Sequence, residues 1–138
     1  MISVSKKMIN AIPSYFSDMP LYRKAQDIIV LSQNISIYLN QDLNYINNDG
    51  SEDPHIYFSG DIVQQSYSLA PEIINAEREK FSKKKYKHIE RIDRLTSLLY
   101  KNCKRLEKAN SNGKDYLSIL RTELKTFRLL KNNWILTL

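Results

Sequence analysis

The fold class is decided by residues 83–109, which read KKKYKHIERIDRLTSLLYKNCKRLEKA. Apolar side chains recur there in steps of three and four, the spacing that places them on one face of an α-helix. The members of this apolar stripe are Ile89, Ile92, Leu95, Leu99, Cys103 and Leu106. We therefore predict a helix over about 83–109 that buries this face against the rest of the chain.

The same spacing recurs in three other segments, which predicts helices over about 21–43, from Phe58 or Asp61 to about Lys80, and over about 115–134. Their predicted core residues are, in order, Leu21, Ala25, Ile28, Ile29, Ile35 and Leu39; Ile62, Tyr67, Ala70, Ile73 and Ile74; and Leu117, Leu120, Leu124, Phe127 and Leu130. Pro71 lies inside the second segment, where it removes one backbone hydrogen bond. We expect this element to be either one kinked helix or two shorter ones.

Polar, turn-forming residues separate the predicted helices at 47–54 and at 110–113, and Pro13 and Pro20 close the first segment of the chain. A length of 138 residues suits one domain, and only three glycines and four prolines interrupt it, which favours long elements. We predict an all-α fold, with an antiparallel up-down four-helix bundle over residues 20–138 and an N-terminal arm over residues 1–19. The roles of the arm and of the acidic loop at 47–54 stay open.

Charge is distributed unevenly along the chain. Residues 1–77 hold four Lys or Arg against nine Asp or Glu, a net charge of −5, whereas residues 78–138 hold seventeen against six, a net charge of +11. Such a basic half is typical of proteins that bind nucleic acid or an acidic protein surface. A solvated face that only keeps the protein in solution is the alternative.

The single cysteine, Cys103, cannot form an internal disulfide and falls among apolar residues. We interpret it as a small core residue of a protein from a reducing compartment. Neither the first residues nor any later segment has the apolar run of a signal peptide or of a membrane span. We expect a cytoplasmic protein that does not enter a membrane.

The two histidines, His55 and His88, lack the sequence neighbours that catalysis or metal binding requires. Glu52 to His55 spell Glu-x-x-His, but a di-metal carboxylate bundle needs that motif twice on helices. His88-Ile89-Glu90 matches the His-x-Glu of zinc deaminases, but no Pro-Cys-x-x-Cys follows it. Arg78 precedes His88 by a longer spacing than helical ribonucleases use, and the chain has no glycine-rich phosphate loop. We expect no catalytic residue, no metal and no cofactor.

A stripe of cations on the third predicted helix is the strongest functional signal. Its members, separated by three, four or seven residues and so on one side of the helix, are Lys84, Lys87, Arg91, Arg94, Lys101, Arg105 and Lys108. Lys87 lies two positions from Ile89, about 200° round the helix, so the stripe faces away from the core. Over about 36 Å it can contact several phosphates without reading a base.

Further cations extend the predicted nucleic-acid-binding surface. They are Lys83 and Lys104 beside the stripe, and Arg121, Lys125 and Arg128 on the fourth predicted helix. Tyr86 and Tyr100 could stack on bases, although tyrosines at helical spacing are more often core or interface residues. We predict binding with little dependence on nucleotide sequence.

Several positions match a known family in order and spacing. The motifs are Gly60-Asp61 in the second predicted helix, Phe81-Ser82-Lys83 before the third, and the terminal pair Trp134-Ile135. Other matching positions are Ile74, Ala76, Arg78, Leu95, Leu98, Leu99, Lys108, Leu120 and Leu124. On these residues, the chain from about 21 to 135 resembles the accessory variability determinant proteins of diversity-generating retroelements, which belong with the four-helix-bundle proteins encoded in ribosomal-RNA intervening sequences. It departs from them at Pro71, at Asn132-Asn133, in its N-terminal arm and in its longer acidic loop.

The resemblance implies a homo-oligomer, specifically a homopentameric ring. It also implies binding to the retroelement reverse transcriptase and its template RNA, or to an RNA/DNA hybrid, in support of mutagenic complementary-DNA synthesis and without polymerase activity of its own. A ring would join the basic stripes of its subunits into one surface on which weak phosphate contacts act together.

Two other classes of protein stay open. A structural or toxin–antitoxin-like bundle would bind a protein partner without nucleic acid, through an apolar tail made of Trp134, Ile135, Leu136 and Leu138. A helical nuclease would instead cleave RNA. The sequence leaves open which RNA is bound, which face contacts the reverse transcriptase and how many subunits assemble.

Overall fold

The computed structural model describes residues 14–43, 50, 55–108 and 114–138. Within these residues there is no strand, and the helices are α2 (Ser14–Asp18), α3 (Pro20–Leu43), α4 (His55–Arg78), α5 (Ser82–Leu106) and α6 (Lys114–Ile135). The prediction of an all-α fold in which four long helices pack together is confirmed. The predicted limits are close to the observed ones, except that α4 begins at His55 rather than at Phe58 or Asp61.

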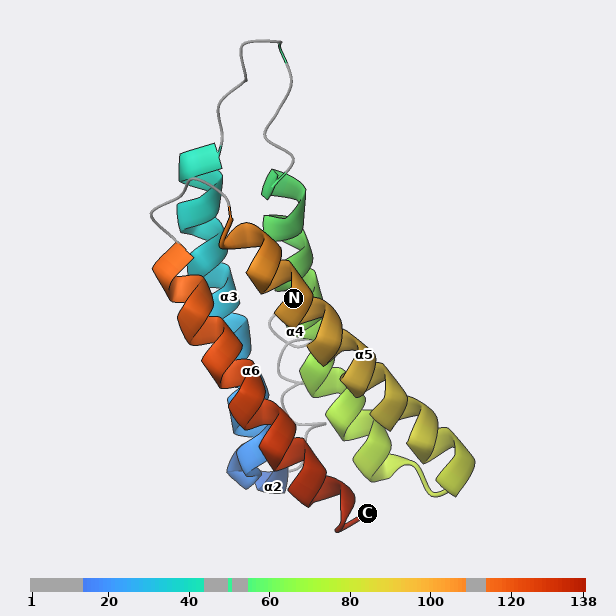
Figure 1. Ribbon diagram of the computed structural model, residues 1–138. Helices are drawn as coiled ribbons and strands as arrows, with labels where there is room; N and C mark the ends of the chain where they lie inside the picture. The colour runs from blue at the N-terminus through green and yellow to red at the C-terminus, as the bar shows by residue number, and fades with distance from the viewer. Residues whose placement is uncertain (1–13, 44–49, 51–54, 109–113) are drawn as a thin grey trace, which may run out of the picture.

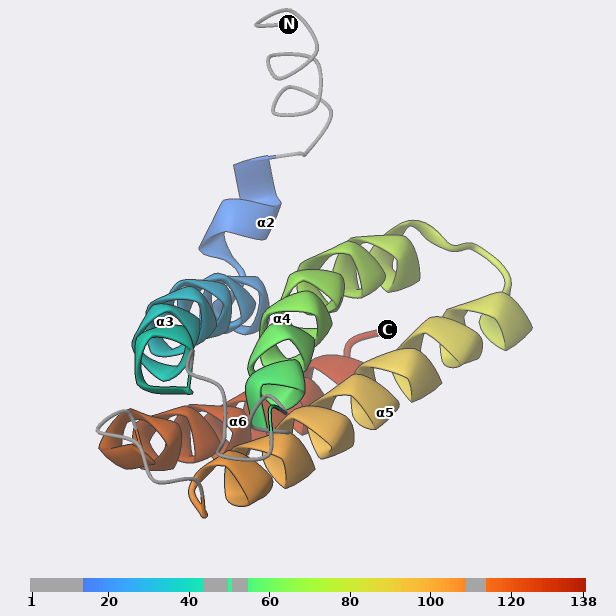
Figure 2. The ribbon, with the colours of Figure 1, turned by 90° about the horizontal axis from the view of Figure 1, so that it is seen from above.

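The four long helices form two layers. One layer is made by α3 and α4 and the other by α5 and α6, and both α3 and α5 pack against α4 and α6 (Figure 2). The colours in Figure 1 run up α3, down α4, up α5 and down α6. In both views the turn that joins α4 to α5 projects sideways, beyond α3 and α6.

The apolar stripes meet in one core. All of the predicted core residues are buried except Tyr67, Ile74, Leu95 and Leu130. Ile74, Leu95 and Leu130 are partly buried, whereas the prediction for Tyr67 is wrong. Half of the Tyr67 side chain is exposed, because this residue lies at the edge of the α3–α4 interface, where its hydroxyl accepts a hydrogen bond from Gln33 Nε2.

Serines occupy core positions between α3 and α4. The buried hydroxyls of Ser32 and Ser66 lie 2.7 Å apart, and Ser66 Oγ donates to the backbone oxygen of Ile62 at 2.6 Å. A second pair, Ser36 on α3 and Ser59 on α4, repeats the contact, with the two hydroxyls 3.0 Å apart. Every fully buried polar side-chain atom in the described residues has a hydrogen-bond partner. We call these four serines the serine seam. It is compatible with a dry interface, since buried hydroxyls are costly only when they are unpaired.

Pro71 lies inside α4, which continues through it as one helix. The single-helix alternative is the correct one. Figure 2 shows the axis of α4 changing direction along its length. A bend is the expected response, because proline supplies no N–H to the helical ladder and its ring crowds the preceding turn.

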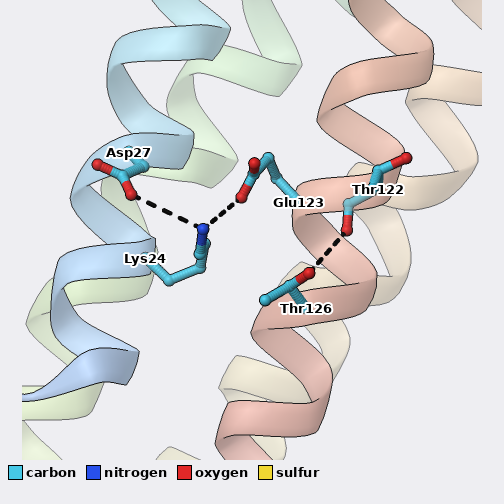
Figure 3. Close-up of polar contacts among 5 residues, drawn as sticks. All are labelled: Lys24, Asp27, Thr122, Glu123 and Thr126. Carbon is cyan, nitrogen blue, oxygen red and sulfur yellow. Dashed lines mark hydrogen bonds and ion pairs between the residues drawn. The ribbon is translucent and has the colours of Figure 1, made fainter.

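A salt bridge joins the two layers across α3 and α6 (Figure 3). Lys24 Nζ on α3 lies 2.6 Å from Glu123 Oε2 on α6 and 3.8 Å from Asp27 Oδ2 on its own helix. Beside it, Thr126 Oγ1 donates to the backbone oxygen of Thr122, one turn back along α6, at 3.3 Å. Since all three charged groups retain contact with solvent, we expect the pair to stabilise the fold by no more than about 1 kcal/mol.

The described part of the N-terminal segment is α2, which packs against α3. The Phe16 side chain is fully buried, and its ring centroid lies 6.0 Å from that of Tyr22. Gly50, in the predicted acidic loop, has a φ of +86°, a conformation that favours glycine. Residues 1–13, the rest of the loop at 47–54 and the predicted turn at 110–113 lie outside the described residues.

Candidate nucleic-acid interface

The cations predicted on the third helix form an exposed face of α5. All nine are exposed: Lys83, Lys84, Lys87, Arg91, Arg94, Lys101, Lys104, Arg105 and Lys108. Eight of them lie on α5, and Lys108 lies in the turn that follows it. The opposite face of α5 carries its buried residues, among them Ile92 and Leu99. This separation follows from the 3.6-residue period, because charged side chains are rarely buried and each helical position has a fixed direction.

Contacts with neighbouring helices define the two edges of this face. On the α4 side, Arg91 Nη1 lies 3.6 Å from Glu72 Oε1, and Asn102 Nδ2 donates to Gln65 Oε1 at 3.1 Å. On the α6 side, Asp93 pairs with the buried ammonium of Lys131. Between these edges, the helical period places five cations within about 40° of arc on the outermost surface. We call these the outer cations; they are Lys83, Lys87, Arg94, Lys101 and Arg105.

A second group of cations surrounds Tyr100 where α5 meets α6. Lys104 Nζ lies 5.5 Å from the Tyr100 ring centroid, and the central guanidinium carbon of Arg121 lies 5.8 Å from it. Arg121 Nε also donates to Glu107 Oε1 at 2.8 Å, so this cation is fixed in place rather than freely projecting. With Lys125, these residues form what we call the Tyr100 cluster.

The electrostatics of the Tyr100 cluster confirm an excess of positive charge. A hydrogen bond from Arg121 lowers the pKa of Tyr100 below its ordinary value of 10.0, and the charges of Lys125, Arg121 and Lys104 lower it further, against the opposing effect of desolvation. Hydrogen bonds to Glu107 and Tyr100 raise the pKa of Arg121. Such a site stabilises an added negative charge, because the same cations that lower the pKa of Tyr100 attract any anion placed beside them.

The cluster also decides between the two roles considered for Tyr100. Its side chain is half-buried beside α6, and two cations lie over its ring. We therefore assign Tyr100 to the α5–α6 interface, where it holds Lys104 and Arg121, rather than to base stacking. Lys125 and Arg128 are exposed on α6, whereas Arg121 is only partly exposed.

His88 has a partner that the sequence did not reveal. Its Nδ1 lies 2.6 Å from Glu72 Oε2, across the α4–α5 interface, and the same carboxylate receives Arg91. Both side chains are largely buried. The pairing joins residues sixteen positions apart, so only the tertiary fold brings them together.

Trp134 was predicted to form part of an apolar tail that a protein partner could contact. This prediction is wrong. Its side chain is buried in the core cluster, and its Nε1 donates to Glu77 Oε1 on α4 at 2.6 Å. Its helical position continues the buried series Leu120, Leu124, Phe127 and Lys131, which is why it faces inward. Of the predicted apolar tail, Leu136 and Leu138 are exposed and Ile135 is partly buried.

The described residues contain no group of three or more His, Cys, Asp or Glu side chains placed to hold a metal ion. None of the described helices is long and apolar enough to cross a membrane.

No protein-family model, curated protein or solved structure matches this chain. The resemblance to accessory variability determinant proteins therefore stays a prediction.

Proposed function

We propose that this chain is a non-catalytic RNA-binding accessory protein whose binding surface is the outer face of α5, extended by the Tyr100 cluster. The observation that carries this proposal is the exposure of eight cations along α5, opposite its buried face, and of Lys108 in the turn that follows. α5 has 25 residues and so extends over about 37 Å, which is long enough to follow several phosphates of one nucleic acid.

The mechanism follows from the kind of side chains on this face. Lysine and arginine neutralise phosphates and release condensed counterions, which favours binding without reading the bases. In the Tyr100 cluster, contacts with Tyr100 and Glu107 already restrict Arg121, so less side-chain freedom is lost when a phosphate binds. RNA and an RNA/DNA hybrid offer the same phosphate backbone to such a surface.

We propose that the chain assembles as a homo-oligomer, a pentamer, and supports a reverse transcriptase in template-RNA-dependent mutagenic synthesis of complementary DNA. Support for this part comes from the sequence resemblance. Repeating the outer face of α5 in each subunit would raise avidity, because each further contact on the same RNA becomes intramolecular.

A bundle that binds a protein partner without nucleic acid is the second candidate. It is favoured by exposed apolar residues on α3 and α6, where Tyr38 and Tyr116 stack with ring centroids 5.5 Å apart and planes 5° from parallel. Beside them lies a groove of about 510 Å³, lined in part by Leu31 and Ile37. Apolar surface of this kind is typical of protein contacts rather than of phosphate contacts.

The test compares two variants with equal changes of net charge. The first removes exposed cations of α5 and of the turn that follows it, by Lys87→Gln, Arg94→Gln, Lys101→Gln and Lys108→Gln. The control adds acids to exposed positions of α3 and α4 by Gln26→Glu, Asn34→Glu, Gln64→Glu and Asn75→Glu. Each set lowers the net charge by four, and neither changes a buried residue.

RNA retention by each protein on a filter separates the candidates. The proposal predicts a large loss of RNA affinity in the α5 variant and a small loss in the control. Equal losses would show that net charge alone attracts RNA. Absence of RNA binding by the parent chain would favour the protein-binding candidate.

A further inference from the structure

Two large aromatic rings are exposed where α4 turns into α5. The Phe81 side chain is 66% exposed and the Tyr86 side chain 60% exposed. The turn that carries Phe81 is the part of the molecule that projects beyond α3 and α6 in Figures 1 and 2. Solvent and ligands therefore reach both rings from outside the bundle.

Folding does not explain Phe81. It is the N-cap residue of α5, with φ −91° and ψ 123°, and its side chain makes no capping hydrogen bond. Helices prefer Ser, Thr, Asp or Asn at this position because those side chains satisfy free backbone N–H groups. Phe81 thus neither fills the core nor caps the helix.

Five lysines lie next to Phe81 and Tyr86 in the sequence. They are Lys80, Lys83, Lys84, Lys85 and Lys87, and Lys84 Nζ lies 5.5 Å from the Phe81 ring centroid. The first turn of α5 contains no acidic residue, and Glu79 Oε1 accepts a hydrogen bond from the backbone N–H of Phe81. Cations in the first turn oppose the helix dipole, so this density of lysine is unfavourable for the helix itself. A polyanion is the partner whose charge complements it.

We propose that this aromatic–lysine end binds unpaired nucleotides. Phe81 and Tyr86 each stack on a base, and the surrounding lysines bind the flanking phosphates, the combination by which single strands are held without sequence preference. The inference rests on the proposed RNA-binding function and gives it a substrate class. Paired bases in a duplex expose their edges but not their faces, so the rings contribute only to binding of single-stranded RNA or of unpaired segments.

The rings can be removed without disturbing the charge. In the double variant Phe81→Ala, Tyr86→Ala every lysine stays, and neither substitution removes a buried side chain or a capping hydrogen bond. The matched control is Tyr38→Ala, Tyr116→Ala, which removes two exposed rings from the other aromatic pair, on α3 and α6. Circular dichroism verifies that both variants keep the helical content of the parent.

Each protein is titrated with a single-stranded RNA, with an abasic oligonucleotide of the same length and with a duplex of the same sequence. We expect the Phe81, Tyr86 variant to lose at least about five-fold in affinity for the single strand per ring that stacks. Its affinity for the abasic strand and the duplex should stay close to that of the parent. The Tyr38, Tyr116 control should bind all three like the parent.

Other results would overturn the inference in distinguishable ways. If the Phe81, Tyr86 variant binds the single strand like the parent while the Lys87, Arg94, Lys101, Lys108 variant loses binding, the stacking site is wrong and RNA binding by α5 stands. If the parent binds no RNA, both proposals fail. If the rings matter for binding to anionic phospholipid vesicles but not to RNA, the aromatic–lysine end is a membrane-surface contact and the inference is wrong.

Discussion

Trp134 Nε1 donates a 2.6 Å hydrogen bond to Glu77 Oε1, which joins the C-terminal end of α6 to the C-terminal end of α4. The indole is buried, and the carboxylate is only partly exposed. Because Trp134 is the single tryptophan of the chain, its fluorescence reports this contact directly. The contact also limits which part of the C-terminus is available to a partner.

The Trp134–Glu77 contact should contribute measurably to the stability of the bundle. Trp134→Ala should lower the free energy of unfolding by about 3–5 kcal/mol, since it removes a large buried ring. Trp134→Phe keeps most of the ring but leaves the Glu77 carboxylate unpaired, at a cost of about 1–3 kcal/mol. Deleting residues 136–138 should change stability by no more than about 0.5 kcal/mol, because Leu136 is 84% exposed. Urea unfolding followed by circular dichroism measures all three, and a deletion as costly as Trp134→Ala would contradict this assignment.

Leu99 tests the buried face of α5. It is fully buried in the middle of the apolar stripe, so Leu99→Ala should lower the free energy of unfolding by about 2–5 kcal/mol. Leu98→Ala, at the neighbouring exposed position, is the matched control and should have a small effect. Equal effects of the two substitutions in urea unfolding would show that the wrong face of α5 has been placed in the core.

Cys103 offers a chemical test of the same face. Burial raises the pKa of its thiol from 9.0 to about 12, so the folded protein holds little reactive thiolate at pH 8. We expect a disulfide reagent to label Cys103 only as urea unfolds the chain. Between about pH 9 and pH 12 the unfolded thiol loses its proton and the folded one keeps it, so stability should fall as pH rises. Cys103→Ala should weaken that fall, and rapid labelling of the folded chain would argue against burial.

Tyr100 reports whether a phosphate enters its cluster. A hydrogen bond from Arg121 lowers the pKa of Tyr100, and the charges of the nearby lysines lower it further. A bound phosphate would neutralise these charges and raise the pKa again. Ultraviolet titration of the parent against Tyr100→Phe isolates this one phenol. Single-stranded DNA is the suitable ligand, because RNA is cleaved at alkaline pH. An unchanged Tyr100 pKa with saturating DNA would place the nucleic acid outside the cluster.

The sequence predicted the helices and most of the core because apolar residues such as Ile92 and Leu99 repeat with the helical period. It could not predict the serine seam, since Ser32 and Ser66 interrupt the apolar pattern and become acceptable in the core only by pairing across α3 and α4. The prediction that Tyr67 lies in the core was wrong for the opposite reason. Its position fits the stripe, but the neighbouring helix leaves that edge open to solvent.

In the candidate site, too, some features follow from the sequence pattern and others depend on contacts between helices. Exposure of the outer cations could be predicted because charged side chains avoid the core. The ion pairs at the edges of the site could not be predicted, because Arg91–Glu72 and Arg121–Glu107 join segments that only the tertiary fold brings together. The exposure of Phe81 could not be predicted either, since an aromatic residue between two helices is ordinarily expected to pack against the core.

The salt dependence of RNA binding tests the central claim most directly. If the outer face of α5 binds phosphates, the logarithm of the association constant should fall linearly with the logarithm of salt concentration, with a slope of about −0.7 to −0.9 per contacted phosphate. The Lys87, Arg94, Lys101, Lys108 variant should bind more weakly, with a slope shallower by roughly 3 units, while the Gln26, Asn34, Gln64, Asn75 control keeps the slope of the parent. A variant that binds with the affinity and slope of the parent would contradict the account and leave the cations of α5 as a solvated surface.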